Sequence, residues 1–231
     1  MTIDIDVLDT QHSDLDDTFR RHAFEHLRDS GAVEVIDVVA TSPGGAESAQ
    51  RTLDVLVARG MAIIENDRLV AFDGLSIQPT KHRMRLGDDS LFTWCPADAV
   101  GIPAALGEDG EVVTACPYCS AEIVLSIHFG EPQGDADLIL WLPTANCSHV
   151  VTQFCPDVNF FCSREHLDAW RSQAGNPEGE TLSAEGAAEL GRQWQSSRRP
   201  HEEAAAARWL DPRPRSDQRP HRRNEGVRLP T

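Results

Sequence analysis

The chain lacks any long hydrophobic run. No stretch of its 231 residues approaches the ~18 apolar residues that a membrane-spanning helix requires. Its first residues, MTIDIDVLDTQHSDLDD, also lack the positively charged and apolar regions of a secretory signal. These absences predict a cytoplasmic protein that is neither exported nor bound to a membrane.

Positive charge is scarce in most of the chain. Residues 198–231 hold nine of the 21 basic residues and five of the 37 acidic ones, which leaves 12 basic against 32 acidic residues in 1–197. Nucleic-acid phosphates require a basic binding surface. The acidic body therefore argues against nucleic acid as a partner.

Cysteine is missing from most of the chain and concentrated in one part of it. All six cysteines lie between positions 95 and 162, namely Cys95, Cys116, Cys119, Cys147, Cys155 and Cys162. Disulfides are rare in the cytoplasm, and scattered buried cysteines would not cluster in this way. The clustering favours thiol chemistry or the binding of a soft metal.

The hydrophobic pattern predicts an α+β protein. An acidic lead, residues 1–14, precedes a winged-helix-like domain, residues 15–85, made of three helices and a hairpin around Glu65-Asn66-Asp67. A mixed α/β-sheet catalytic domain would occupy residues 86–197, and the Arg/Pro-rich tail, residues 198–231, is expected to be disordered. Because the first domain is acidic, we expect it to serve as a scaffold rather than to read DNA.

Particular elements follow from the same pattern in the second domain. Residues 99–106, 163–170 and 181–194 predict helices, the second of them capped by Ser163. Strands are expected at residues 110–115, 121–129, 135–143 and 148–154. The sequence contains no internal repeat.

The segment WCPAD pairs a thiol with a carboxylate. Proline after Cys95 favours extended geometry at the cysteine and can itself be the first residue of a helix. Cys95 would then cap that helix, Asp98 would lie in its first turn, and the helix dipole would favour the thiolate. A carboxylate beside thiolates can take up a proton and return it elsewhere, although a buried cysteine next to a capping aspartate has the same spacing.

Three segments in order resemble the alkylmercury (organomercurial) lyase family. They are Trp94-Cys95 with Asp98, then Cys116, then Phe154-Cys155 followed by Phe160-Phe161, and the resemblance extends over roughly residues 15–195. It implies that Cys95 and Cys155 bind mercury and that Asp98 manages the proton. The implied reaction is protonolysis of the carbon–mercury bond, for mercury detoxification, with no required cofactor. Hg(II) would be the bound product, and cellular thiols or a mercuric reductase would remove it.

The remaining cysteines leave a structural zinc site open. Cys116, Cys119, Cys147 and His149 supply four ligands of the kind that zinc binds, and Cys162 and His166 are alternative completions. Cys116-Pro-Tyr-Cys119 also has the spacing of a glutaredoxin-type redox motif, but that motif requires a following helix and the next residues alternate as in a strand.

Two other functions compete with the lyase. The cysteines could be the sensor of a metal-responsive winged-helix transcription regulator, or the chain could act on another organometallic compound, such as an organotin. DNA binding that depends on ionic strength would favour the regulator, and release of benzene from phenylmercury would favour the lyase.

Overall fold

The computed structural model describes residues 17–134, 137–144 and 147–194, all of which belong to one compact unit of the chain. The predicted acidic lead and the predicted tail lie outside the described residues. Helices and antiparallel sheets alternate along this part of the chain, so the expected mixture of α and β structure is confirmed. No helix in the described residues combines the length and the apolar character needed to cross a membrane.

The N-terminal elements follow the predicted order. Helices α2 (Asp17–Ser30), α3 (Val35–Ala40) and α4 (Ala46–Ala58) are followed by the hairpin of β2 (Ala62–Glu65) and β3 (Arg68–Phe72). The two turn residues of the hairpin, Asn66 and Asp67, both have positive φ, as a two-residue turn between twisted strands requires. A short strand, β1 (Val33–Glu34), pairs with β3.

A nine-stranded sheet continues from this hairpin into the rest of the chain. Its further strands are β4 (Leu75–Ser76), β5 (His82–Leu86), β6 (Asp89–Thr93), β7 (Gly110–Ala115), β8 (Glu122–His128) and β9 (Glu131–Gln133). The strands run in the order β1-β3-β4-β6-β5-β7-β8-β9, with β2 also paired to β3, and all these pairings are antiparallel. The predicted boundary at residues 85–86 lies inside β5, so both predicted domains share one sheet.

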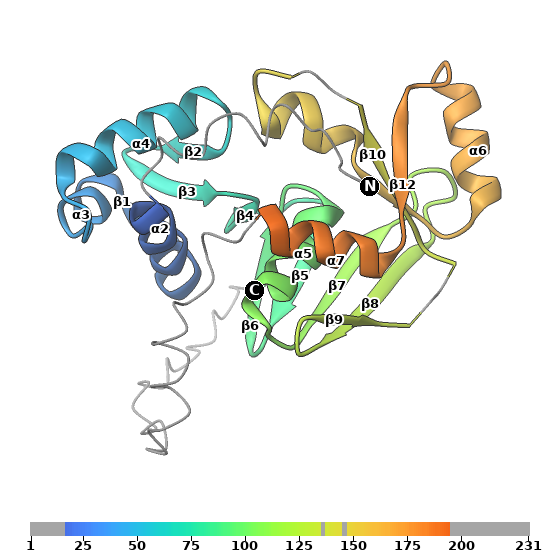
Figure 1. Cartoon of the computed structure of the whole chain (residues 1–231), viewed down its shortest axis with the longest axis horizontal. Coiled ribbons are helices and arrows are strands. Elements are labelled where there is room, and N and C mark those ends of the chain that lie inside the picture. The colour runs from blue at the N-terminus through green and yellow to red at the C-terminus, as the bar shows by residue number, and fades with distance from the viewer. Residues whose placement is uncertain (1–16, 135–136, 145–146, 195–231) are drawn as a thin grey trace, which may run out of the picture. The chain divides into compact units, whose positions relative to one another are not determined.

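Helix α5 (Pro96–Leu106) is buried along most of its length. It packs against the sheet strands and against α7 (Ala184–Trp194), and the two helices lie side by side in Figure 1. Gly101 and Gly191 meet where they cross, since a Cβ atom at Gly191 would lie only 2.1 Å from the Cα of Gly101. Small residues on both helices therefore allow the close contact.

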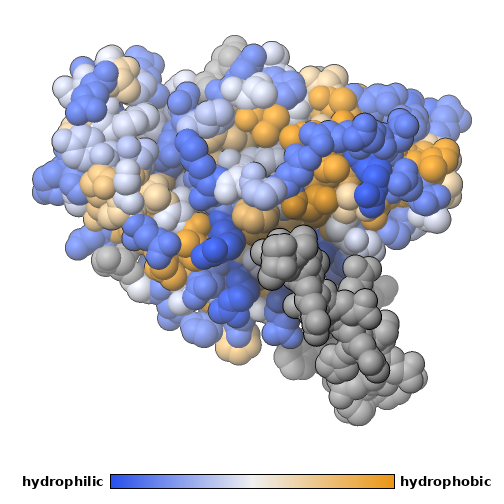
Figure 2. Space-filling model, turned by 180° about the vertical axis from the view of Figure 1, so that it is seen from behind, coloured by the Kyte–Doolittle hydropathy of each residue, from blue (hydrophilic) through white to orange (hydrophobic). Residues whose placement is uncertain are grey.

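A second, three-stranded sheet completes the described chain. Its strands, in the order β11-β10-β12, are β10 (Ile139–Pro143), β11 (Asn159–Phe161) and β12 (Gly179–Leu182). Helix α6 (Arg164–Gln173) follows β11, and the hydroxyl of its cap residue Ser163 accepts the backbone N–H of His166, as predicted. In Figure 2, hydrophobic side chains gather near the upper middle of one face and are flanked by hydrophilic ones.

One predicted element was wrong, and the start of another was placed too early. Residues 148–154, expected as a strand, contain the π-helical turn Val150–Phe154. The Gln153 side chain accepts the backbone N–H groups of Ser148 and His149, while Val150 and Val151 donate theirs to Arg59 and Gly60. These bonds occupy the groups that a neighbouring strand would need.

The helix expected at residues 181–194 begins later than predicted. Its first two residues belong to β12, which pairs with β10, and α7 starts at Ala184. The hydroxyl and carbonyl of Ser183 accept the N–H groups of Gly186 and Ala187, so Ser183 separates strand from helix.

Candidate functional site

Cys95 occupies the N-cap of α5, as the WCPAD segment predicts. Its backbone is extended, with φ −147° and ψ 168°, and Pro96 is the first residue of the helix. The hydroxyl of Thr93 donates a hydrogen bond to the Cys95 carbonyl, and the same carbonyl accepts the N–H of Ala99. These two bonds fix the backbone of Cys95 at the start of the helix.

Cys95, Asp98 and Cys155 come together although the two thiols are 60 positions apart in the chain. The S–H of Cys95 donates to Oδ2 of Asp98 over 3.1 Å, and one ligand atom from each residue lies within 4.8 Å of the others. Cys95 is 2% exposed and Cys155 3%, whereas Asp98 is half-buried. Two soft sulfurs and one carboxylate thus surround a single point that is largely shielded from water.

Burial decides the ionisation of Cys95. Desolvation raises the pKa of this thiol well above its ordinary value, and the hydrogen bond to Cys155 and the charge of Asp98 raise it further. The sequence predicted the opposite direction, because the helix dipole favours a thiolate. That prediction was wrong, since loss of hydration outweighs the lowering effect of the backbone N–H of Asp98 at the start of the helix.

Cys155 is held by a tightly bonded turn. It starts the 3-10 turn Cys155–Asp157 directly after the π-helical turn and has helical backbone angles, not the extended geometry expected before proline. Val150 and Val151 anchor this segment to the carbonyls of Arg59 and Gly60, at the end of α4. The N-terminal helices therefore take part in positioning the second thiol.

Gly74 lies directly against the Asp98 carboxylate. A Cβ atom at this position would come within 2.4 Å of Oδ1 of Asp98, and φ at Gly74 is +88°. The Gly74 carbonyl also accepts the N–H of Trp94, the residue before Cys95. Sequence reasoning missed this contact. The only signal was the turn dipeptide Asp73-Gly74, which does not reveal what the turn packs against.

A buried ion pair supports the same turn. Arg20 of α2 donates from Nε and Nη2 to Oδ2 of Asp73, over 3.1 and 2.9 Å, and both side chains are almost fully enclosed. Sequence reasoning did not single out either residue, because an arginine on a helix gives no sign of a partner 53 residues away. The pair connects the first described helix to the residue next to Gly74.

The structure assembles a second cluster, from Cys116, Cys119, Cys162 and His166. One ligand atom from each lies within 4.8 Å of all the others. Cys116 and Cys119 were predicted to join Cys147 and His149. The structure instead brings them together with Cys162 and His166, the alternative ligands. Cys147 instead interacts electrostatically with Cys155. The ring of His149 packs against Gly60, and its Nδ1 shares a hydrogen bond with the hydroxyl of Thr152.

The attachment of Val150 and Val151 to the end of α4 explains this difference, because it keeps His149 against Gly60 and Cys147 near Cys155. Strand β8 follows Cys119 closely, so the helix that a glutaredoxin-type motif requires is absent from these described residues.

The thiols of this second cluster are strongly interdependent. Burial acts to raise the pKa of Cys116, but backbone hydrogen bonds from Cys162, Cys119 and Tyr118 outweigh it and lower the value to about 7. Desolvation and hydrogen bonds with Cys119 and Cys116 raise the pKa of Cys162 to about 12. Ionisation of one sulfur thus opposes ionisation of the next.

Known proteins are similar to this chain in sequence or in fold. Alkylmercury lyases of Bacillus cereus and Pseudomonas putida are 27% identical over 175 residues and 29% identical over 151 residues. These alignments cover 74% and 62% of this chain and 78% and 68% of those proteins. The crystal structure of the mercury-bound form of MerB2 superposes with a TM-score of 0.73 at 22% identity, over 84% of this chain and 96% of that one. It supports the fold.

The regulator hypothesis gains no support from these relatives. The family model described as alkylmercury lyase (MerB) matches residues 75–196, which is more than half of the chain and includes both thiols and the carboxylate of the first cluster. On this match, the chain belongs to the alkylmercury lyase family.

Proposed function

We propose that this protein cleaves the carbon–mercury bond of organomercury compounds by protonolysis, with Cys95, Asp98 and Cys155 as the working residues. The observation that carries the proposal is the S–H···O hydrogen bond between Cys95 and Asp98, with Cys155 beside it in an enclosed site. Family membership supplies the reaction, and this geometry supports the roles proposed for the three residues.

The first step is capture of the substrate by one thiol. Cys155 displaces the ligand X of an organomercury compound R–Hg–X, so that a sulfur–mercury bond forms, the mercury–X bond breaks, and the thiol proton leaves with X. The substrate mercury is then close to the second sulfur, because the ligand atoms of Cys95, Asp98 and Cys155 all lie within 4.8 Å of one another. Thiolates are the ligands that soft metals prefer.

Asp98 then moves one proton in two stages. It takes the proton of Cys95 along the existing 3.1 Å hydrogen bond, and the Cys95 thiolate binds the mercury. Two sulfurs donate electron density to the metal and weaken its bond to carbon. The protonated Asp98 gives the proton to the departing carbon, which leaves as the hydrocarbon R–H. Hg(II) remains on both sulfurs, and Asp98 is a carboxylate again.

The low exposure of the site suits this proton transfer. A carboxylate that is poorly hydrated has a stronger tendency to hold a proton, and exclusion of water keeps that proton for the carbon. Cellular thiols, or a mercuric reductase, would remove Hg(II) and regenerate the enzyme. Because only thiols present in excess can compete with two sulfurs, we expect turnover to require them.

We also propose that the N-terminal winged-helix-like segment is a scaffold for this site. Three contacts support a structural role: the Arg20–Asp73 ion pair, the pairing of Arg28 with Glu108 over two 2.9 Å hydrogen bonds, and the attachment of the Cys155 segment to the end of α4. The salt dependence of binding to duplex DNA tests it, and specific binding would contradict the scaffold role.

The lyase proposal is tested by turnover of phenylmercury with excess thiol, measured as benzene release. We expect Cys95→Ser, Cys155→Ser and Asp98→Asn each to lose at least about 10²-fold in turnover, with effects that do not add when combined. Cys147→Ser is the matched control, a neighbouring thiol to which the mechanism gives no role. Normal turnover by Cys155→Ser would exclude the two-sulfur mechanism, and absence of benzene release from the wild type would exclude the function.

A further inference from the structure

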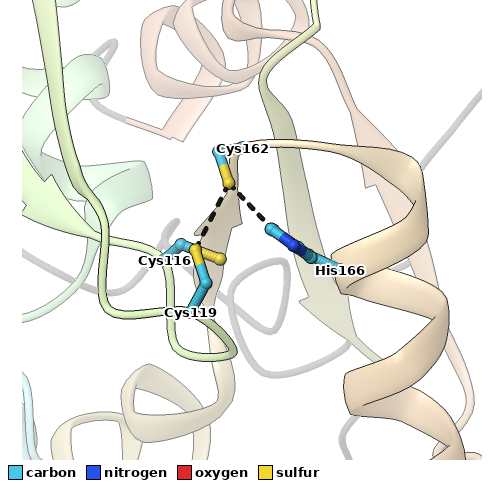
Figure 3. A group of neighbouring side chains, drawn as sticks. All are labelled: Cys116, Cys119, Cys162 and His166. Atoms are coloured by element: carbon cyan, nitrogen blue, oxygen red, sulfur yellow. Dashed lines mark hydrogen bonds between the residues drawn. The ribbon is translucent and has the colours of Figure 1, made fainter.

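Four ligand groups outside the proposed active site converge on one point. Cys116 and Cys119 lie on the turn between β7 and β8, Cys162 follows β11, and His166 lies in the first turn of α6 (Figure 3). The sulfurs of Cys119 and Cys162 are 3.6 Å apart, and the Cys162 sulfur is 3.0 Å from Nδ1 of His166. In the proposed mechanism none of these four residues has a role.

We propose that Cys116, Cys119, Cys162 and His166 form a structural zinc site. Three thiolates and one imidazole are a common ligand set of closed, four-coordinate zinc. Zinc–sulfur bonds of about 2.3 Å in a tetrahedron place two sulfurs about 3.8 Å apart, close to the separation of Cys119 and Cys162. All four donors already lie within 4.8 Å of one another, so binding requires only small shifts of side chains.

Hydrogen bonds fix the backbone of the turn that carries Cys116 and Cys119. Ser120 follows Cys119 with φ of +61°, and its N–H donates to the Cys116 carbonyl over 2.8 Å. The Cys116 N–H in turn donates to Ala121 over 2.9 Å, which closes the turn. The backbone N–H groups of Tyr118, Cys119 and Cys162 bond to the Cys116 sulfur. These N–H groups fix the orientation of the sulfur.

The other half of the site is equally fixed. Cys162 and His166 are four residues apart at the start of α6, where the Ser163 cap holds the backbone of His166. The ring of Tyr118 packs against the ring of His166, with centroids 5.0 Å apart, so the imidazole is also held from the side of the Cys-x-x-Cys turn. A disulfide between Cys119 and Cys162 would use only two of these four groups. It would not explain why Cys116 and His166 lie at the same point.

Zinc at this position would connect two parts of the catalytic domain. It would join the β7–β8 turn to the end of β11, and β11 follows the turn that carries Cys155. Bound metal stabilises the folded chain by the free energy of binding, because the unfolded chain offers no assembled site. The metal would thus hold the segment of the second active-site thiol without contacting substrate.

The test is the metal content of the full chain, purified with reductant and without chelator, after supply of zinc. We expect about one zinc ion per chain by mass spectrometry of the metal, a lower midpoint of thermal unfolding after removal by a strong chelator, and recovery when zinc is returned. Cobalt in place of zinc should show thiolate-to-metal charge transfer and the absorption bands of a tetrahedral ion.

Variants separate this site from the alternative one. His166→Ala and Cys162→Ser should lose most of the zinc, whereas His166→Cys should keep it as a four-cysteine site and Cys147→Ser should keep it unchanged. The proposal is overturned if the reduced, zinc-supplied wild type holds less than about half an ion per chain. It is also overturned if it holds a different metal, if it contains a Cys119–Cys162 disulfide, or if Cys147→Ser loses the zinc. All of these readouts are independent of lyase activity.

Discussion

At the scale of single residues, the proposed active site depends on groups that never touch the substrate. Gly74 is the clearest example, because the Asp98 carboxylate occupies the space where a side chain at this position would lie. The carboxylate must stay within hydrogen-bonding distance of Cys95 to take up its proton. A residue 24 positions earlier in the chain thereby controls the position of the carboxylate that handles the proton.

Replacing Gly74 by alanine should therefore impair catalysis more than folding. The new methyl group pushes Asp98 away, and a displacement of this size can cost about 10²-fold in turnover. Gly175→Ala is the matched control, because φ there is +82° but a Cβ atom would meet nothing within 4 Å. Both variants should lose roughly 1 kcal/mol of stability from the strained backbone. Equal turnover by the two would contradict the role of Gly74.

His82 should make stability depend on pH. Burial, and to a smaller extent the charge of Lys81, lowers its pKa from 6.5 to about 4, and its Nδ1 bonds to the hydroxyl of Thr114 over 2.8 Å. The folded state thus disfavours the protonated ring. The stabilisation is fully present above pH 6.5 and is lost as the pH falls towards 4, because the unfolded chain then binds the proton more readily.

We expect this loss to be on the order of 3 kcal/mol between pH 6.5 and 4, measured as the free energy of unfolding in urea. His82→Asn should have a flatter dependence over the same range. A wild type and a variant with parallel curves would show that His82 does not account for the pH dependence.

At the scale of elements, the first described helix is tied to the site by a buried charge pair. Arg20→Met would leave Asp73 enclosed without the guanidinium, and breaking such a pair typically costs about 3–5 kcal/mol. The double variant Arg20→Met/Asp73→Asn removes both charges and should recover a large part of that loss, as measured by denaturant unfolding. If the double variant is no more stable than Arg20→Met alone, the pair is not what the mutation disrupts.

The crossing of α5 and α7 offers a second test at this scale. A methyl group at Gly191 would collide with the backbone of Gly101, so Gly191→Ala should cost about 1–3 kcal/mol of stability. Gly186→Ala, on the same helix, would place its Cβ 3.2 Å from the Cβ of Leu182, a milder contact than the one at Gly191, and should change the stability by less than about 1 kcal/mol. Gly191→Ala should therefore lower the midpoint of thermal unfolding clearly more than Gly186→Ala.

Most elements could be predicted from the sequence because their signals are local. Alternating residues identified β7 and β8, and Ser163 marked the start of α6. The segment before Cys155 could not be predicted, since its apolar residues resemble a strand and its shape comes from Gln153 and from carbonyl groups about 90 residues earlier. Residues 181–182 were assigned to a helix because their pairing with β10 is not local.

At the scale of the whole molecule, the sequence motif identified the residues of the candidate site. It could not predict the environment of these residues. The letters of WCPAD indicated the pair of Cys95 and Asp98, and the family pattern added Cys155. The raised pKa of Cys95 and the contact with Gly74 arise only when distant segments enclose the sulfur. For the same reason, the sequence limited the possible ligands of the second cluster to a few cysteines and histidines. The choice between His149 and His166 required the fold.

The domain boundaries and the cytoplasmic location stay predictions. One sheet is shared across residues 85–86, and contacts from α2 and α4 reach the site, so the N-terminal segment and the thiols are structurally linked. Deleting the N-terminal segment is therefore expected to abolish turnover together with the cooperative unfolding transition.

The enclosure of the Cys95 sulfur has a consequence for the enzyme between encounters with its substrate. Peroxides and other oxidants attack accessible thiolates, and this sulfur is neither accessible nor readily ionised in the folded chain. The resting protein should therefore survive aerobic stress with its reactive group intact, and the exposed Cys119 should be oxidised first whenever it is left without a metal.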